Sequence, residues 1–364
     1  MKRRDFLAGI GGAAAVTACS PSSNTSSDGA ARSDERFNWR IVTTWAPNFP
    51  GLGTAVNTLV RNIEEMSGGR LRIRIYAAGE LIPAFEVFDA VSRGTAEMGH
   101  GASYYWRGQV EAAQFFASIP FGLNAHEMNG WLYYGGGLDL WREVYAPFNL
   151  VPFPAGNTGV QTGGWFNKRV DSVADLRGLK MRIPGIGGEV LKLAGGTPVN
   201  LPGADIFTAL QTGTIDAAEW VGPYNDVAAG LHRAARYYYY PGWQEPGPTL
   251  ECIVNRRAFE SLPDDLKAIV QVACQAVNLD MTAEFMARNA QSLKQLEADE
   301  SVEILEFPAP VLAELKRLTF QVVDGLAARD PVSAKVWESY RAFLEQSESW
   351  QRASELAYLN TREG

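Results

Sequence analysis

The first candidate for chemistry is a carboxylate at the end of a predicted buried strand. The apolar run 215–220 favours a short strand, and Glu219 lies near its end, before an aromatic residue and a Gly-Pro turn. A buried carboxylate is costly unless it has a partner, which here is an arginine, a metal ion or a ligand. Because most glutamates are exposed, this stretch alone equally permits a solvated loop residue.

Two further polar side chains occupy comparable positions. Arg182 lies near the end of the alternating strand 179–183, before a proline and a glycine, where its planar fork can pair with a carboxylate. Gln161 lies within residues 155–165, a run with four glycines, and the pair 160–161 fits a strand that would point Gln161 toward a cleft. This run is not a phosphate loop, because no helix follows it and it has no GK[ST] motif.

The remaining sequence offers little for metal–sulfur or nucleophilic chemistry. It contains three widely spaced histidines and three cysteines, with no CxxC or Cys/His zinc pattern. Cys252 falls in an apolar strand and Cys274 on the apolar face of a helix, so two buried free thiols are expected rather than a disulfide. The net charge of −8 argues against nucleic acid or an anionic membrane as the main partner, although a local arginine or metal ion can still hold a small anion.

These residues need elements that bring them together, and the pattern predicts an α/β protein with two lobes. The 364 residues, 46% of them hydrophobic, are ample for two domains. Strands and helices alternate over 37–100, as in a lobe whose strands end at a shared crevice. A helix–Gly–Thr–strand unit occurs at 92–98 and again at 211–217, which indicates a second, similar lobe. Tyr104 follows the first unit where Glu219 follows the second, so both are expected at one cleft, with ordinary packing as the alternative for the tyrosine.

The N-terminal residues are predicted to direct export of the protein and not to belong to its folded domains. Residues 1–18 carry a twin arginine and an apolar stretch too short for a permanent span, and they are predicted to be a signal peptide. Small residues directly precede Cys19, as in a bacterial lipobox, which predicts lipidation of that thiol and a periplasmic protein anchored to a membrane. A simple cleaved signal with an incidental cysteine is the alternative. Residues 19–36 lack apolar bulk and are predicted to be a disordered tether.

Taken together, the motifs resemble the substrate-binding subunit of a tripartite ATP-independent periplasmic (TRAP) transporter over about residues 37–345. The resemblance rests on four segments: Gly178-Leu-Lys-Met-Arg182, Gly213-Thr-Ile-Asp216, Glu219-Trp220 and Tyr237-Tyr-Tyr-Tyr-Pro-Gly-Trp243. The run Gly156-Asn-Thr-Gly-Val-Gln-Thr-Gly-Gly-Trp-Phe166 is similar to the branch of that family that binds 2-oxo acids or lactate together with a cation.

The resemblance implies a two-lobed α/β periplasmic binding protein with hinge crossovers and long C-terminal helices. Residues 37–157 with 248–290 are expected to form one lobe, and residues 158–247 with 291–320 the other. The hinge is expected where the chain passes from one lobe to the other. Residues 321–364 are expected to form a helical extension that either pairs two subunits as a homodimer or packs on its own domain.

The resemblance also implies a role for each site residue. Arg182 is expected to pair with the ligand carboxylate, and Gln161 to touch both ligand and cation. The expected ligand contacts are Tyr104, Asn157, Gln161, Arg182 and Glu219. The expected cation ligands are Gln161, Glu219, the backbone carbonyl of Trp220, and Glu245.

Oxygen ligands of this kind suit calcium or sodium rather than zinc. Glu219, Glu245 and a monocarboxylate bring three negative charges, of which Arg182 balances one, so a divalent ion would neutralise the rest. This favours calcium, whereas sodium becomes equally suitable if Glu245 only accepts hydrogen bonds. Gln244 departs from the family pattern, which places an aromatic residue there, so the identity of the carboxylate stays open.

The sequence therefore predicts a solute-binding protein, and not an enzyme. It would capture a small monocarboxylate, either a 2-oxo acid such as pyruvate or lactate, with a cation, and deliver it to a TRAP membrane permease. A metal-dependent enzyme acting on small carboxylates is the alternative, because two glutamates and an arginine beside a metal can do acid–base chemistry. Against it, the predicted pocket set contains no histidine and no nucleophile–base pair. A lipoprotein adhesin would explain the anchor but not the set of buried polar residues.

Overall fold

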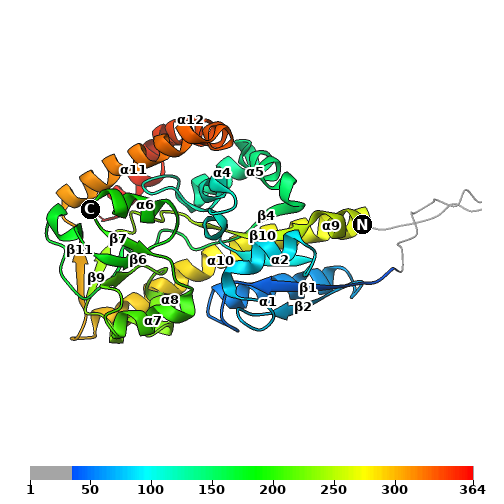
Figure 1. Ribbon diagram of the computed structural model, residues 1–364, viewed down its shortest axis with the longest axis horizontal. Helices are drawn as coiled ribbons and strands as arrows, with labels where there is room; N and C mark the ends of the chain where they lie inside the picture. The colour runs from blue at the N-terminus through cyan, green and yellow to red at the C-terminus, as the bar shows by residue number, and fades with distance from the viewer. Residues whose placement is uncertain (1–34, 364) are drawn as a thin grey trace, which may run out of the picture. The chain divides into compact units, whose positions relative to one another are not determined.

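The computed structural model describes residues 35–363. The predicted signal peptide, Cys19 and most of the predicted tether lie outside these residues. Within 35–363, no helix is both long and apolar enough to cross a membrane. The described part contains two β-sheets with helices packed around them (Figure 1).

The first sheet has five strands in the order β2-β1-β3-β10-β4. Its strands are β1 (Phe37–Thr43), β2 (Leu71–Tyr76), β3 (Met98–Gly101), β4 (Leu150–Asn157) and β10 (Thr249–Asn255). Strand β1 runs parallel to β2 and β3, whereas β10 runs antiparallel to β3 and β4. Side chains alternate along β2, because Leu71 and Ile73 are buried while Arg72 and Arg74 face solvent. Helices α1 (Leu52–Met66) and α2 (Val87–Ser92) pack on this sheet.

The second sheet has six strands in the order β11-β9-β5-β8-β6-β7. Its strands are β5 (Gly164–Phe166), β6 (Lys180–Arg182), β7 (Thr197–Val199), β8 (Ala217–Ala218), β9 (Tyr237–Tyr240) and β11 (Glu303–Glu306). The helices beside it are α6 (Gly185–Leu193), α7 (Gly203–Gln211) and α8 (Pro223–Ala228). The predicted strand over 215–220 is shorter than expected, because the chain turns toward Gly222-Pro223 and only two residues pair with β5 and β6.

The chain passes between the two sheets after β4 and again before β10, and α10 (Asp264–Glu297) spans the same distance. Helix α10 packs on β4 and α1 of the first sheet's lobe and on α8 of the second (Figure 1). The strand predicted at 160–161 is wrong. Gln161 instead pairs with the other crossover, since its N–H donates to the Glu245 carbonyl at 3.1 Å and its carbonyl accepts from Gly242 at 3.0 Å. The left-handed φ of +71° at Gly159 ends the extended run after β4.

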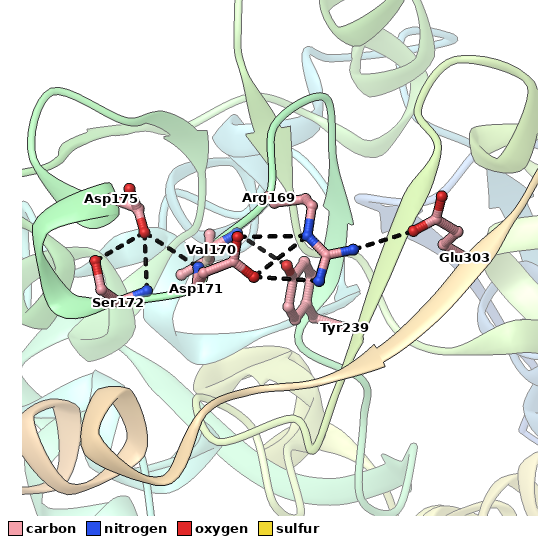
Figure 2. Close-up of polar contacts among 7 residues, drawn as sticks. All are labelled: Arg169, Val170, Asp171, Ser172, Asp175, Tyr239 and Glu303. Carbon is pink, nitrogen blue, oxygen red and sulfur yellow. Dashed lines mark hydrogen bonds and ion pairs between the residues drawn. The ribbon is translucent and has the colours of Figure 1, made fainter.

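The connection that leads toward β6 is fastened to the far edge of the second sheet. Figure 2 shows Arg169 joining Asp171 of its own loop to Glu303 of β11, with nitrogen–oxygen distances of 3.2 Å. The Val170 N–H donates to the Tyr239 hydroxyl at 2.8 Å, and Asp175 accepts from the Ser172 N–H to cap the following turn. These contacts fix the entry to β6 and hence the position of Arg182.

The long C-terminal helices that the resemblance implies are present as α11 (Ala309–Arg329), α12 (Pro331–Ala353) and α13 (Glu355–Glu363), interrupted at Asp330 and Ser354. Helix α12 packs on α4 (Ala125–Tyr134) and α5 (Gly137–Tyr145) (Figure 1). There the Tyr340 hydroxyl accepts from the Leu123 N–H at 2.7 Å.

The prediction that Cys252 and Cys274 are buried free thiols is confirmed.

The remaining elements are short. They are α3 (Gln114–Ala117), α9 (Arg256–Ser261), η1 (Ala84–Glu86), η2 (Ser103–Trp106), η3 (Glu111–Ala113), η4 (Ala146–Phe148), η5 (Val173–Leu176) and η6 (Leu231–Arg233). Of these, η2 matters most for the site, because it carries two tyrosines into the space between the sheets.

Candidate functional site

Arg182 and Glu219 meet because their strands are neighbours. Parallel pairing of β6 with β8 places Arg182 opposite Ala218, and the Glu219 N–H donates to the Arg182 carbonyl at 3.1 Å. Both side chains are almost wholly buried, and the guanidinium forms an ion pair with the carboxylate. Each residue lies at the end of its strand, as predicted, and the pairing of the two strands brings their side chains together.

Several neighbours hold the Arg182 guanidinium in place. Its Nη1 also donates to the Glu219 carbonyl at 3.1 Å, its Nε to the Leu201 carbonyl at 3.1 Å, and its Nη2 to the Tyr105 hydroxyl at 3.3 Å. The Trp220 ring centroid lies 5.2 Å from the guanidinium carbon, within cation–π range. A guanidinium fixed in this way presents its charge in one orientation.

Burial raises the pKa of the Glu219 carboxyl to about 7, although Arg182 acts in the opposite direction. Burial and the negative charge of Glu219 raise the pKa of Glu245 well above its usual range. The opposing influences on Glu245 are the Arg182 charge and hydrogen bonding from Tyr104 and Gln161. Two acids this close cannot both ionise cheaply without an added positive charge. The pair is therefore tuned to release protons when a cation arrives.

Four side-chain oxygens around these acids have no hydrogen-bond partner among the described residues. They belong to Gln161 (Oε1), Glu219 (Oε2), Gln244 (Oε1) and Glu245 (Oε2). Each buried acceptor left unpaired costs roughly 1–3 kcal/mol, so such a group needs an explanation. The Gln244 amide also faces the Glu219 carboxyl, whose pKa it lowers.

A cation fits this donor set. All four atoms are hard oxygens, which calcium and sodium prefer. Across residues 35–363, no three His, Cys, Asp or Glu side chains gather at one point, so a metal site here must use amide or carbonyl oxygens as well. The Glu219, Glu245 and Gln161 oxygens meet that requirement, and Trp220 follows Glu219 directly in the chain. A contribution of the Trp220 carbonyl stays a prediction.

The two tyrosines of η2 bring the first lobe into the site. Tyr105 accepts the Arg182 hydrogen bond, and Tyr104 faces Glu245. Tyr104 was predicted from its place after β3, whereas Tyr105 was not assigned a role although it is the next residue. Gln244 was noted only as a departure from the family pattern. Its amide oxygen has no hydrogen-bond partner in the described part of the chain, so it offers an acceptor that an aromatic ring would lack.

Asn157 lies at the hinge rather than beside Arg182 in the described contacts. Its amide nitrogen donates to the Gly247 carbonyl at 2.9 Å, and its oxygen accepts from the Gly159 N–H at 2.8 Å. The side chain thus ties the two crossovers together just before Gln161. Its predicted contact with a ligand remains untested.

A third buried carboxylate, Asp226, lies beside the site. Asp226 accepts from the Trp165 indole at 3.0 Å and from the Tyr238 hydroxyl at 2.8 Å, and Thr162 donates to the same tyrosine at 2.9 Å. Burial raises the Asp226 pKa to about 6, despite these hydrogen bonds, and its charge in turn raises the pKa of Glu219. The polar network therefore extends from the crossover through β9 to α8.

Comparison with known proteins agrees with this geometry. The family model described as "Bacterial extracellular solute-binding protein, family 7" (DctP) matches residues 41–330. A monocarboxylate 2-oxoacid-binding periplasmic protein of Nostoc sp. strain PCC 7120 is 42% identical over 360 residues, which cover 99% of this chain and 98% of the relative.

Two solved structures are similar over the same region. A TRAP periplasmic solute-binding protein from Colwellia psychrerythraea, with bound calcium and pyruvate, has a TM-score of 0.88 and 43% identity, covering 90% of this chain and all of that one. A TRAP periplasmic solute-binding protein from Pseudoalteromonas atlantica T6c, with bound sodium and pyruvate, has a TM-score of 0.87 and 44% identity, covering 90% of this chain and 99% of that one.

Proposed function

The chain belongs to the DctP family of bacterial extracellular solute-binding proteins, and on that premise we propose that it captures a 2-oxo monocarboxylate together with a calcium or sodium ion. The family acts in TRAP transport, so the captured solute would pass to the membrane permease subunits. The observation that carries the proposal is the buried Arg182 next to four side-chain oxygens that have no hydrogen-bond partner within residues 35–363. The Arg182 guanidinium suits an anion, and the four oxygens suit a cation.

A 2-oxo acid can use both at once. Its carboxylate would take the Arg182 fork, and its carboxylate and keto oxygens would chelate the cation held by Glu219, Glu245 and Gln161. The cation resolves the difficulty of an acidic site that binds an anion, because it neutralises the two buried carboxylates first. The similar proteins from Colwellia and Pseudoalteromonas, which hold pyruvate with calcium or with sodium, support either ion.

The contact between the lobes also favours capture. Arg107, which follows η2, donates to Glu189 of α6 at 2.8 Å, and the Asn225 amide donates to the Pro50 carbonyl at 2.8 Å. Trp45 of the first lobe packs edge-on against Trp220 of the second, with centroids 6.4 Å apart. A ligand held at Arg182 would be enclosed by both lobes, as expected for a protein that binds and releases by opening its hinge.

Calorimetry on protein stripped with a chelator tests the proposal. Pyruvate is expected to bind when calcium or sodium is restored and to lose most of its affinity when Arg182 is replaced by alanine. The matched control is Arg317→Ala, because that arginine lies on the exposed face of α11 and, among residues 35–363, pairs only with neighbours on its own helix. Equal binding of pyruvate by Arg182→Ala and the control would contradict the assignment.

We also propose that the site binds without catalysis, because holding a carboxylate accounts for Arg182 and holding an ion accounts for Gln161, Glu219 and Glu245. The alternative is a metal-dependent enzyme acting on small carboxylates. Mass spectrometry after long incubation with pyruvate and the cation distinguishes the two. Quantitative recovery of unchanged pyruvate supports binding alone, and a time-dependent product would establish an enzyme.

Two finer features remain proposals. The small residues before Cys19 support lipidation of that thiol, and intact-mass measurement of the native protein beside Cys19→Ala would detect the acyl groups. The exposed side chains of Trp350, Leu356 and Tyr358 on α12 and α13 support a homodimer through the C-terminal helices. Light scattering during size exclusion decides between dimer and monomer.

A further inference from the structure

The chain after β8 presents three successive backbone carbonyls, and the middle one has no hydrogen-bond partner within residues 35–363. The Glu219 carbonyl accepts from the Arg182 Nη1 at 3.1 Å, and the Val221 carbonyl accepts from the Thr162 N–H at 3.1 Å. Between them, the Trp220 carbonyl accepts from no described donor, although Trp220 is buried. Because buried carbonyls are normally paired, this oxygen needs a partner such as water or a cation.

Asp226 fixes the direction in which this carbonyl points. The Val221 N–H donates to the Asp226 Oδ1 at 3.3 Å. The peptide bond between Trp220 and Val221 is trans. In a planar trans peptide the carbonyl and the N–H point in opposite directions, so the Trp220 carbonyl is directed away from Asp226.

The Asp226 side chain is itself held from several directions within the second sheet and the helix beside it. Its Oδ2 accepts from the Trp165 indole at 3.0 Å and from the Tyr238 hydroxyl at 2.8 Å. Its backbone N–H donates to the Gly222 carbonyl at 2.9 Å, and the residue is wholly buried. Because Trp165, Tyr238 and Gly222 lie in or beside this one sheet, the arrangement does not depend on closure of the hinge.

The same loop adjoins the other predicted cation ligands. The Thr162 N–H joins the crossover to the Val221 carbonyl, and the preceding residue, Gln161, donates its N–H to the Glu245 carbonyl at 3.1 Å. Residues 161–162 therefore lie between the loop that carries Trp220 and the crossover that carries Glu245. The unpaired carbonyl is part of the same short stretch of polar groups.

We propose that Asp226 is a positioning residue of the cation site, whose hold on the Val221 N–H keeps the Trp220 carbonyl directed toward the ion. The inference rests on the proposed function, because it needs a cation at Glu219 and Glu245. Both Asp226 oxygens already accept from protein donors, so Asp226 acts through the carbonyl and is not itself a ligand. Groups that orient metal ligands typically change metal affinity by about ten- to a hundredfold when they are replaced.

The first test needs no substitution, because Trp220-Val221 is the only Trp-Val pair in the sequence. Protein labelled with ¹³C at tryptophan carbonyls and ¹⁵N at valine amides therefore gives a single cross-peak in an NMR spectrum that correlates each amide with the carbonyl before it. Calcium with pyruvate is expected to shift the carbonyl resonance of this cross-peak. The Val221 amide is expected to be protected from hydrogen exchange both with and without calcium.

Either of two results in this spectrum would overturn the proposal. One is a carbonyl resonance that saturating calcium leaves unchanged. The other is a Val221 amide that exchanges as fast as an unfolded chain while the protein is folded.

The second test compares two substitutions that remove the same charge. Asp226→Leu removes the acceptor, whereas Asp226→Asn leaves an oxygen that can accept from the Val221 N–H. The leucine variant is expected to bind calcium about ten- to a hundredfold more weakly than the unmodified protein and to lose most of the calcium-induced carbonyl shift. The asparagine variant is expected to recover about threefold of that loss, the contribution of one ordinary hydrogen bond.

Asp324→Leu is the matched control. Asp324 also accepts from a tryptophan indole, that of Trp337 at 3.0 Å, but it is exposed on α11. This variant should bind calcium within about twofold of the unmodified protein, because surface charges far from the ion are screened.

The outcomes separate this inference from the proposed function. If Asp226→Leu does not fold, the cross-peak of the unmodified protein still decides. Equal calcium affinities of the leucine and asparagine variants, with the full carbonyl shift in both, would reduce Asp226 to a distant charge, and only this inference would fail. If the unmodified protein binds neither calcium nor pyruvate, the proposed function fails and the inference fails with it. Loss of calcium affinity together with loss of the carbonyl shift supports both.

Discussion

Replacing Arg182 by lysine keeps the positive charge and removes the fork. The guanidinium donates to the Leu201 carbonyl, to the carbonyl and carboxylate of Glu219, and to Tyr105. A lysine ammonium is a single point at the end of a flexible chain and can satisfy only part of this set. At least two charge-assisted hydrogen bonds are expected to be lost.

The magnitude follows from those bonds. Each hydrogen bond to a charged group contributes about 1.5–3 kcal/mol, so losing one such bond to the ligand carboxylate costs about ten- to a hundredfold in affinity. The buried ion pair with Glu219 should be weakened as well, lowering the free energy of unfolding by about 2 kcal/mol. Calorimetry at saturating calcium measures the first effect, and thermal unfolding without ligand measures the second.

The control is Arg317→Lys on the exposed face of α11, which should change neither quantity. A folded Arg182→Lys protein that binds pyruvate as tightly as the unmodified protein would refute the idea that the planar fork holds the carboxylate. A loss of stability without a loss of affinity would assign Arg182 a structural role only.

Three further outcomes are expected. The Glu219 carboxyl has a pKa of about 7, and the pKa of Glu245 is raised as well, so both are protonated more readily than usual. Calcium must displace these protons, so its affinity should fall as the pH falls from 8 to 6, by up to tenfold per pH unit for each proton displaced. Calorimetry in matched buffers measures this change. Burial raises the Glu251 pKa to about 8, so the folded protein favours the neutral carboxyl, and the stability that this form gives is full at low pH and is lost as the pH rises toward 8. Glutamine does not titrate, so the stability of Glu251→Gln should rise relative to that of the unmodified protein by up to ~1.4 kcal/mol per pH unit between pH 5 and 8. Urea unfolding at a series of pH values measures this difference. Because the Trp106 indole donates to Glu251 and Trp106 ends the turn that carries Tyr104, Glu251→Leu should weaken pyruvate binding several-fold while Glu251→Gln preserves it; equal affinities in the two variants would detach Glu251 from the site.

Much of the scaffold followed from local patterns. The strands over 37–43, 71–76 and 249–255 were predictable because their apolar residues alternate or run continuously. Arg182 and Glu219 were predictable as candidates because each lies near a strand end. They are neighbours because β6 pairs with β8. No local sequence pattern predicts this pairing, and only the resemblance to the family placed the two residues in one site.

The sequence-based predictions were wrong or incomplete where the chain leaves regular helices and strands. Gln161 was expected in a strand, but it pairs with the second crossover, about 80 residues away in sequence, which no periodicity can reveal. The roles of Tyr105 and Gln244 depend on side chains from different lobes meeting across the cleft. The break between α12 and α13 at Ser354 carried no glycine or proline to mark it.

The most direct test of the account is the affinity for pyruvate measured by calorimetry on chelator-treated protein, first without and then with calcium or sodium. The account predicts that the cation strengthens pyruvate binding by at least tenfold, and that pyruvate strengthens cation binding by the same factor. Identical pyruvate affinities in cation-free and cation-loaded protein would contradict it, because the oxygens of Gln161, Glu219 and Glu245 would then have no part in holding the ligand.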